Sequence, residues 1–263
     1  MQLENKTIWI TGASSGIGKA LCFDLAARRC RLVLSARHEN TLEAVRQQLP
    51  NPDQHWVVPL DLGQADQLQN IVNKALPDIG EVHALINNGG VSQRSFAAET
   101  DLAVDRQLME VNYLGTVAMS KALLPHFMQC GSGTIMSVAS VAGKVGSQLR
   151  SGYSGSKHAV IGYMDSLRAE LHQHGIHVLV ACPGWVRTDL SINALDAQGQ
   201  PNNAVGQASR KGISAEDCAD QIVHALQQDK AEVIIGKGLS GIAPLMKRIA
   251  PGLVAWVNRR EFR

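Results

Sequence analysis

The octapeptide Thr11-Gly12-Ala13-Ser14-Ser15-Gly16-Ile17-Gly18 follows a short apolar run and opens a segment of helical period. Its glycines would let the backbone turn tightly and approach a pyrophosphate, whose charge is favoured by free N–H groups and by the helix dipole. The spacing is G-x-x-x-G-x-G, unlike the common G-x-G-x-x-G fingerprint, and a plain connection from strand to helix is the alternative. The surrounding strand–turn–helix pattern favours a loop that binds the phosphates of a dinucleotide.

The pattern around this loop continues along the chain, because short β-branched runs alternate with longer segments of helical period. Strands are expected at residues 7–11, 32–35, 56–60, 84–88, 134–138, 176–182 and 232–235. Helices are expected from about residues 17, 41, 64, 153 and 215, with two more across residues 101–129. Nearly continuous apolar strands joined by helices predict one Rossmann-like, doubly wound parallel α/β sheet of about seven strands, with helices on both faces.

Composition limits the class of protein. The chain has 263 residues, of which 45% are hydrophobic and 18% charged, and this length suits one domain over residues 1–236 followed by a tail. The net charge of +2 comes from scattered basic residues, so a nucleic-acid partner is not expected. The five cysteines form no C-x-x-C pair, which predicts no metal site and a reducing compartment. Because residues 1–9 do not resemble a signal peptide and no apolar run approaches about 20 residues, a soluble cytoplasmic protein is expected.

In a doubly wound sheet, ligands bind beyond the carboxyl ends of the strands, so the residues there are candidates for a site. Arg37 follows the second expected strand, where a dinucleotide would present its adenosine ribose. A guanidinium there would pair with a 2′-phosphate, so Arg37 favours NADP over NAD unless it is only a solvated surface charge. Asp61, after the third strand, could accept a hydrogen bond from the adenine amino group or simply begin a helical turn.

The sequence Asn87-Asn88-Gly89-Gly90 closes the fourth expected strand. Asn and Gly tolerate left-handed backbone conformations, so a structural turn is one interpretation. A lining for the nucleotide cleft is the other, and the residue types alone barely separate the two.

Tyr153 and Lys157, in Tyr153-Ser154-Gly155-Ser156-Lys157, share one face of an expected helix, with Ser140 thirteen positions before the tyrosine. A tyrosine with the ordinary pKa of about 10 is a poor acid or base at neutral pH, but a nearby cation favours the phenolate and lowers that pKa. Ser140 could hydrogen-bond a substrate oxygen while charge develops on it. A tyrosine and a lysine at this spacing also occur by chance as a surface pair, and they point to chemistry only together with Ser140 and the glycine loop.

Together these motifs resemble a classical short-chain dehydrogenase/reductase over about residues 7–235. The resemblance implies the catalytic tetrad of that family at four positions of this chain, namely Asn112, Ser140, Tyr153 and Lys157. In that tetrad, Tyr153 transfers the proton, Lys157 also holds the nicotinamide ribose, and Asn112 helps to retain a relay water.

The same resemblance implies a bound dinucleotide. The implied contact residues are Gly12, Ser14, Ser15, Gly16, Ile17, Gly18, Arg37, Asp61, Leu62, Asn88, Gly90, Tyr153, Lys157, Pro183, Gly184, Val186 and Thr188. A basic residue such as Arg37 after the second strand is the family's usual mark of a preference for NADP. Gly89 departs from the family, which usually has alanine there, and this change could loosen the turn.

Two segments near the end of the chain bear on partners. Residues 189–212 are rich in small and polar residues, and we expect them to form a loop over the substrate or a plain surface loop. The tail, residues 237–263, carries apolar residues at helical spacing beside basic ones, and we expect it to pack on the same domain. A neighbouring subunit or an anionic membrane surface is the alternative. The resemblance also implies a homodimer or homotetramer, built through the helices from about residues 114 and 153.

The function that these residues favour is NADP-dependent transfer of a hydride to or from a small-molecule carbonyl or alcohol, with Tyr153 as the general acid or base. One alternative is a nucleotide-sensing module with vestigial catalysis, which the intact tetrad argues against. An epimerase or dehydratase on the same scaffold is another, although such proteins are usually longer.

Overall fold

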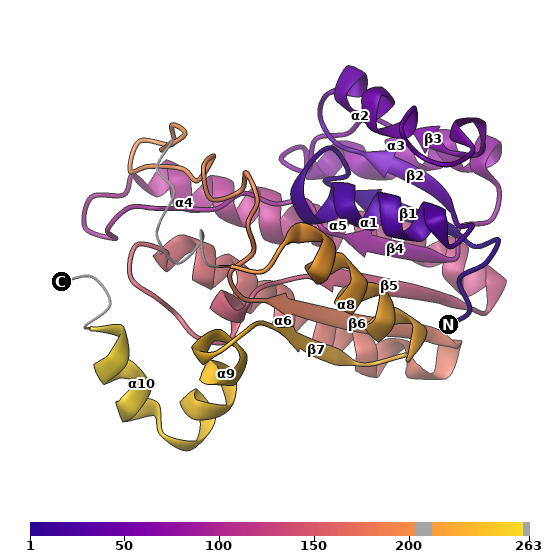
Figure 1. Ribbon diagram of the computed structural model, residues 1–263. Coiled ribbons are helices and arrows are strands. Elements are labelled where there is room, and N and C mark those ends of the chain that lie inside the picture. Colours follow the sequence, from indigo (N-terminus) through magenta and orange to yellow (C-terminus); the bar gives the residue numbers. More distant parts are fainter. Residues whose placement is uncertain (203–211, 260–263) are drawn as a thin grey trace.

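A sheet of seven parallel strands lies at the centre of the computed structural model, which describes residues 1–202 and 212–259 (Figure 1). The strands are β1 (Thr7–Thr11), β2 (Arg31–Ser35), β3 (Trp56–Val57), β4 (Ala84–Asn87), β5 (Gly133–Val138), β6 (Ile176–Pro183) and β7 (Glu232–Ile235). Their order is β3-β2-β1-β4-β5-β6-β7, and every adjacent pair is parallel. The order reverses between β1 and β4, which makes that pair the topological switch point. The expected α/β fold is confirmed.

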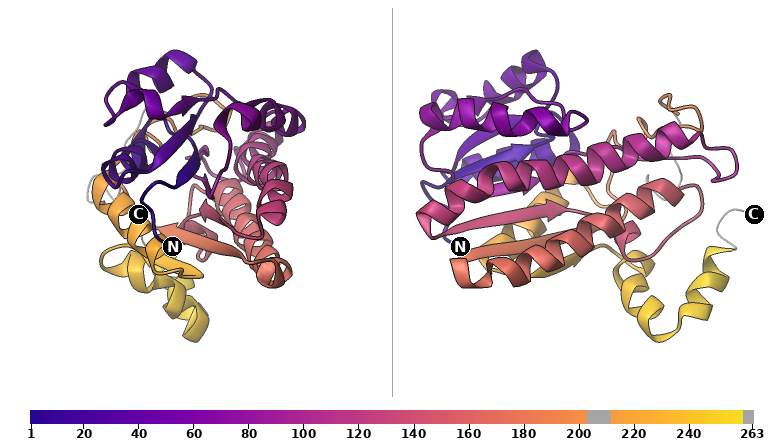
Figure 2. Two further views of the ribbon diagram at one scale, coloured as in Figure 1. Left: turned by 90° about the vertical axis from the view of Figure 1, so that its right-hand side faces the viewer. Right: turned by 180° about the vertical axis from the view of Figure 1, so that it is seen from behind.

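Helices cover both faces of the sheet. One layer contains α1 (Gly16–Ala27), α2 (Glu39–Arg46) and α8 (Ala215–Gln227), and the other contains α3 (Ala65–Ile79), α5 (Gly115–Cys130) and α6 (Ser151–Leu171) (Figure 2). Successive residues of β1 face opposite layers, because Ile8 and Ile10 pack with α1 and Trp9 packs with the other layer. Since both faces are covered, the central residues of the strands are mostly apolar on both faces, as is usual in parallel sheets.

The third strand is shorter than the sequence predicted. A strand was expected over residues 56–60, but only Trp56–Val57 pairs with β2 in the regular ladder. The N–H groups of Val58 and Leu60 still donate to the neighbouring backbone at 3.0 and 3.1 Å. Pro59 lies between them, at a position whose N–H would face the open edge of the sheet, where proline removes no hydrogen bond to β2.

A π-helical turn joins the two helices that were expected across residues 101–129. α4 (Leu102–Met109) runs through this turn, η2 (Glu110–Leu114), directly into α5. A π turn contains one residue more than an α-helical turn and is uncommon outside functional sites. Here it buries Asn112.

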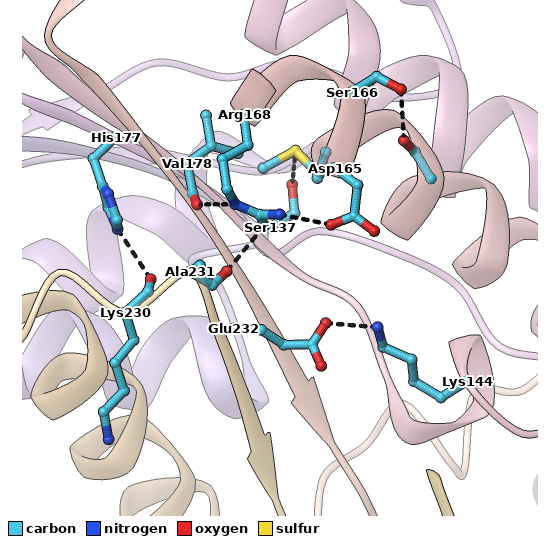
Figure 3. Close-up of polar contacts among 12 residues, drawn as sticks. Ser137, Lys144, Asp165, Ser166, Arg168, His177, Val178, Lys230, Ala231 and Glu232 are labelled. Carbon is cyan, nitrogen blue, oxygen red and sulfur yellow. Dashed lines mark hydrogen bonds and ion pairs between the residues drawn. The ribbon is translucent and has the colours of Figure 1, made fainter. Parts of the chain in front are cut away.

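Side chains hold the edge strand β7 against its neighbours, as Figure 3 shows. The guanidinium of Arg168, on α6, donates to the backbone oxygens of Val178 and Ala231, both at 3.0 Å. Lys144 pairs with Glu232 of β7 at 2.6 Å. An edge strand is paired on one side only, and these side-chain contacts add to the ladder that joins β7 to β6.

The tail forms two helices, α9 (Leu239–Ile249) and α10 (Pro251–Asn258), which extend away from the sheet (Figure 1). Its hydrogen bonds to the rest of the domain include those from Lys247 Nζ to the Lys144 carbonyl and from Asn258 Nδ2 to the Gly146 carbonyl, both 2.8 Å long. Neither helix contains a buried residue, and large apolar side chains are exposed at Leu239, Ile242, Leu245, Ile249, Leu253 and Trp256. Among the helices described, none has the length and apolar character needed to cross a bilayer.

The loop between β1 and α1 leaves no room for a side chain at Gly18. A Cβ built there would lie 2.1 Å from the carbonyl oxygen of Gly12 and 2.4 Å from Nδ2 of Asn88. Gly12 itself has a φ of +66°, which favours glycine. The loop can therefore lie against the end of β4 only because both positions lack a side chain.

We expect Gly18→Ala to lower the free energy of unfolding by about 1–3 kcal/mol, because the added methyl group would force the backbone apart. Urea denaturation followed by circular dichroism measures this change. The matched control is Gly162→Ala on α6, where a Cβ would meet nothing within 4 Å. It should leave the stability unchanged or raise it by up to about 1 kcal/mol, because alanine favours helices. Equal stability of the two variants would contradict the close contact at Gly18.

Candidate active site

Thr11 and Asn88 join the carboxyl ends of β1 and β4. Oγ1 of Thr11 accepts from the N–H groups of Asn88 and Gly89, both at 3.1 Å. Nδ2 of Asn88 donates to the carbonyl oxygens of Thr11 and Gly12 at 3.1 and 3.2 Å. The turn after β4 therefore supports the glycine loop from the neighbouring strand.

Gly89 belongs to the same contact. A Cβ at this position would lie 2.5 Å from Cδ1 of Leu62. The sequence suggested a looser turn at Gly89, but the missing methyl group instead leaves space for Leu62 against the turn. An alanine here would require the Leu62 side chain to move.

The start of α1 has the features of an anion site. Gly12 and Gly16 have φ values of +66° and +52°. Ser15 makes no side-chain capping hydrogen bond, and the first turn of α1 contains no acidic residue. The first N–H groups of a helix have no partner within it, and they lie at the positive end of the dipole. Thr188 borders the same turn, since a Cβ on Gly16 would lie 3.1 Å from its Cγ2. These residues fit a pyrophosphate.

Arg37 and Asp61 follow β2 and β3 at the same edge of the sheet. Arg37 is exposed, and the strand end just before it contacts the glycine loop, because Ala13 N–H donates to the Ser35 carbonyl at 3.1 Å. Oδ1 of Asp61 accepts from the N–H of Gly63 at 2.9 Å. One carboxylate oxygen of Asp61 thus turns the chain toward α3, which the helical-turn interpretation predicted.

Tyr153 and Lys157 lie near the start of α6, and each is only 5% exposed. Burial raises the pKa of Tyr153, while the charge of Arg150 and a hydrogen bond with Ser140 oppose that rise. The structure adds Arg150 as a cation that opposes this rise in the pKa of the phenol, and the effect of Lys157 on the phenol stays a prediction. Nζ of Lys157 donates to the carbonyl oxygen of Val138, at the end of β5, at 3.0 Å.

The surroundings of Lys157 bring two further predicted residues together. Burial lowers the pKa of Lys157 to about 8, so its ammonium can exchange a proton near neutral pH. A Cβ on Gly90 would lie 2.8 Å from Oδ1 of Asn112 and 3.6 Å from Nζ of Lys157. Three segments therefore meet around Lys157, namely the turn after β4, the π turn and α6.

The amide of Asn112 ties these three segments together. Its Oδ1 accepts from the N–H of Val91 at 2.8 Å, and its Nδ2 donates to the Val91 carbonyl at 3.0 Å. Nδ2 also donates to Oγ of Ser156, on α6, at 3.0 Å. The side chain of Asn112 is thus fully engaged in positioning its neighbours.

Ser140 lies between the carboxyl ends of β5 and β6. Its Oγ accepts from the N–H of Ala142 at 3.1 Å and lies 3.3 Å from the carbonyl oxygen of Pro183, to which it donates. The chain that follows Pro183 is also held by a hydrogen bond, since Gly184 N–H donates to the Ile235 carbonyl at 2.7 Å. Val186 is buried beyond them. The residues expected from the fourth, fifth and sixth strands therefore meet beside Tyr153.

Gln93 is a positioning residue that no sequence pattern indicated. Its Oε1 accepts from the N–H groups of Gly152 and Tyr153 at 2.9 and 3.2 Å, and the residue is fully buried. Its Nε2 donates to the hydroxyls of Ser95 and Thr100 at 3.2 and 3.1 Å. A glutamine from a distant loop thus satisfies the N–H groups at the start of α6 and holds Tyr153 in place.

Comparison with known proteins agrees with this arrangement. A family model described as short chain dehydrogenase matches residues 6–199. A Drosophila melanogaster protein named dehydrogenase/reductase SDR family protein 7-like is 38% identical over 99% of this chain and 81% of its own length. The Bos taurus dehydrogenase/reductase SDR family member 7B is 35% identical over 95% of this chain and 79% of its own length.

Solved structures resemble this fold over almost its whole length. A short-chain dehydrogenase from Streptomyces avermitilis has a TM-score of 0.83 at 27% identity, covering 99% of this chain and 100% of the other. A Burkholderia phymatum short chain dehydrogenase/reductase in complex with NAD has a TM-score of 0.84 at 24% identity, covering 100% and 98%. The chain belongs to the short-chain dehydrogenase/reductase family of NAD(P)-dependent oxidoreductases.

Proposed function

We propose that this protein is an NADP-preferring oxidoreductase that interconverts a small carbonyl compound and its alcohol, with Tyr153 as the group that gives or takes the proton. One arrangement carries this proposal. A buried phenol beside the hydroxyl of Ser140, followed one helical turn later by Lys157, lies at the same sheet edge as the glycine loop. This combination brings a proton donor, an oxygen-binding hydroxyl and a nucleotide cradle to one place.

Each residue has a defined part in the reduction. Ser140 holds the carbonyl oxygen while negative charge develops on it. The phenol of Tyr153 gives its proton to that oxygen, so the carbonyl becomes a hydroxyl. Lys157, whose pKa is about 8, then restores the proton to the phenolate. When bound, the nicotinamide supplies the hydride and with it both electrons, and the oxidation of an alcohol reverses every step.

The preference for NADP rests on Arg37. Its side chain is exposed beyond β2, and no acidic residue ends that strand. A guanidinium binds a 2′-phosphate through paired, charge-assisted hydrogen bonds, whereas NAD offers it only a hydroxyl. Arg37 therefore contributes more to binding the phosphorylated cofactor.

Replacing Tyr153 by phenylalanine should reduce kcat by about 10²–10⁴-fold, because it removes the proton donor while keeping the ring. The assay follows NADPH oxidation with a panel of aldehydes, ketones and quinones, and NADPH fluorescence should show unchanged binding. Tyr163→Phe is the control, since Tyr163 lies on the same helix and packs edge to face with Tyr113. Rapid turnover by Tyr153→Phe would refute the proposed role. Wild-type binding of NADPH without turnover across the panel would favour a nucleotide-sensing module.

Arg37→Asp should lower the ratio of kcat/KM for NADPH to that for NADH by about 10-fold to 100-fold, because it exchanges a phosphate-binding cation for a repulsive anion. Both constants come from initial rates with one carbonyl substrate. Lys74→Asp, at an exposed position on α3, makes the same charge change elsewhere and should leave the ratio unaltered. A ratio that stays at the wild-type value in Arg37→Asp would show that NADP preference has another source.

A further inference from the structure

Arg150 immediately precedes α6, three positions before Tyr153, and has no part in the proton transfer. Its guanidinium carbon lies 4.2 Å from the centre of the Trp185 ring and 5.8 Å from the centre of the Tyr153 ring. Trp185 follows β6, so the guanidinium is held between the end of β6 and the start of α6 by contacts with two aromatic faces. A permanent cation is thereby fixed next to the proton donor.

Among the residues that the structure describes, no acidic side chain forms an ion pair with this cation. Arg150 is half-buried, and none of the described carboxylates lies within 4.0 Å of its guanidinium. Asp105 approaches the neighbouring turn, where a Cβ on Gly152 would lie 2.2 Å from its Oδ1, but it forms no ion pair with Arg150. Burial lowers the pKa of Arg150, and the charge of Arg94 lowers it further. A half-buried guanidinium without a carboxylate partner is less stable than one that is paired with an anion.

Arg94 enters from a different part of the chain. Its N–H donates to the carbonyl of Leu195 at 2.8 Å, and its own carbonyl accepts from Nδ2 of Asn202 at 3.1 Å. Leu195 belongs to a small buried apolar cluster that includes Tyr153. The backbone of Arg94 is therefore anchored to the same apolar surroundings as the proton donor.

We infer that Arg150, assisted by Arg94, binds an acidic group of the substrate, so that the natural substrate is a carbonyl or alcohol compound bearing a carboxylate or a phosphate. Both groups present oxygen pairs that one guanidinium binds through two parallel N–H···O bonds. Because the guanidinium carbon lies 5.8 Å from the centre of the Tyr153 ring, one small substrate can contact both the guanidinium and the phenol. The inference rests on the proposed function, because it names the substrate class of the same site.

The test compares matched substrates with the full chain and NADPH. One pair is a keto acid and its methyl ester, and the other is a hydroxyketone phosphate and the free hydroxyketone. In at least one pair, wild-type kcat/KM should be about 10-fold to 100-fold higher for the anionic member, as expected for hydrogen bonds to a charged group. The pair that shows the larger ratio identifies the acidic group as carboxylate or phosphate.

Arg150→Gln should bring this ratio of anionic to neutral substrate close to one. The ratio is the decisive quantity, because any effect of Arg150 on the pKa of Tyr153 acts on both members of a pair and cancels. Arg150→Lys keeps the charge without the planar fork and should retain an intermediate ratio. Arg106→Gln, at an exposed position on α4, removes one positive charge elsewhere and should leave the ratio unchanged.

The outcomes separate this inference from the proposed function. A wild type that reduces neutral members as well as anionic ones, or an Arg150→Gln variant that keeps the wild-type ratio, overturns the inference and leaves the proposed function intact. NADPH binding without reduction of any member, or of the wider panel of aldehydes and ketones, overturns the proposed function itself. Melting temperatures and NADPH fluorescence establish that the variants fold. If Arg150→Gln does not fold, Arg94→Gln decides, because an unchanged ratio there also overturns the inference.

Discussion

The hydrogen bonds between Asn88 and the glycine loop hold together the two halves of the sheet at its switch point. The contact is close because Gly12 and Gly18 exclude side chains from it. On one side of it, β2 and β3 lead to Arg37 and Asp61, and on the other side the later strands lead to the tyrosine. If the glycine loop lay farther from the end of β4, the first N–H groups of α1 would no longer point into the space between the two halves of the sheet. The close contact at Gly12 and Gly18 therefore fixes the position of the nucleotide-binding residues relative to Tyr153.

Burial favours the uncharged form of both Tyr153 and Lys157, the two titratable residues at the centre of the site. It raises the pKa of Tyr153 and lowers that of Lys157 to about 8, so in both residues it favours the neutral form. The two nearby cations, Lys157 and Arg150, differ in whether they can lose a proton. Lys157 can gain and lose a proton near neutral pH, whereas Arg150 remains charged and opposes the effect of burial on the phenol. One cation can take part in proton exchange, and the other supplies a fixed field.

The fold could be predicted because its signals are local, whereas the tetrad was implied by the order of several motifs along the chain and by no single one of them. The glycine loop spans eight residues, and Tyr153 and Lys157 are separated by one helical turn. The features that escaped prediction depend on contacts between distant segments. Gln93 reaches the N–H of Gly152 across 59 positions, and Arg150 acquires its role only because folding brings Trp185 beside it. The roles of the tetrad in catalysis stay a prediction, as does the fit of Arg37 to a 2′-phosphate.

The π turn at Glu110–Leu114 acts as a phase shift within one long helix. Before the turn, Val104 and Leu108 pack in the apolar cluster around Tyr153, and after it α5 packs on the sheet through residues such as Phe127. One residue corresponds to about 100° of rotation in an α-helix, so deleting a single residue from the turn would rotate one of these faces away from its partner. The number of residues between α4 and α5 is therefore more strictly constrained than their identity, and substitutions are tolerated there more readily than insertions or deletions.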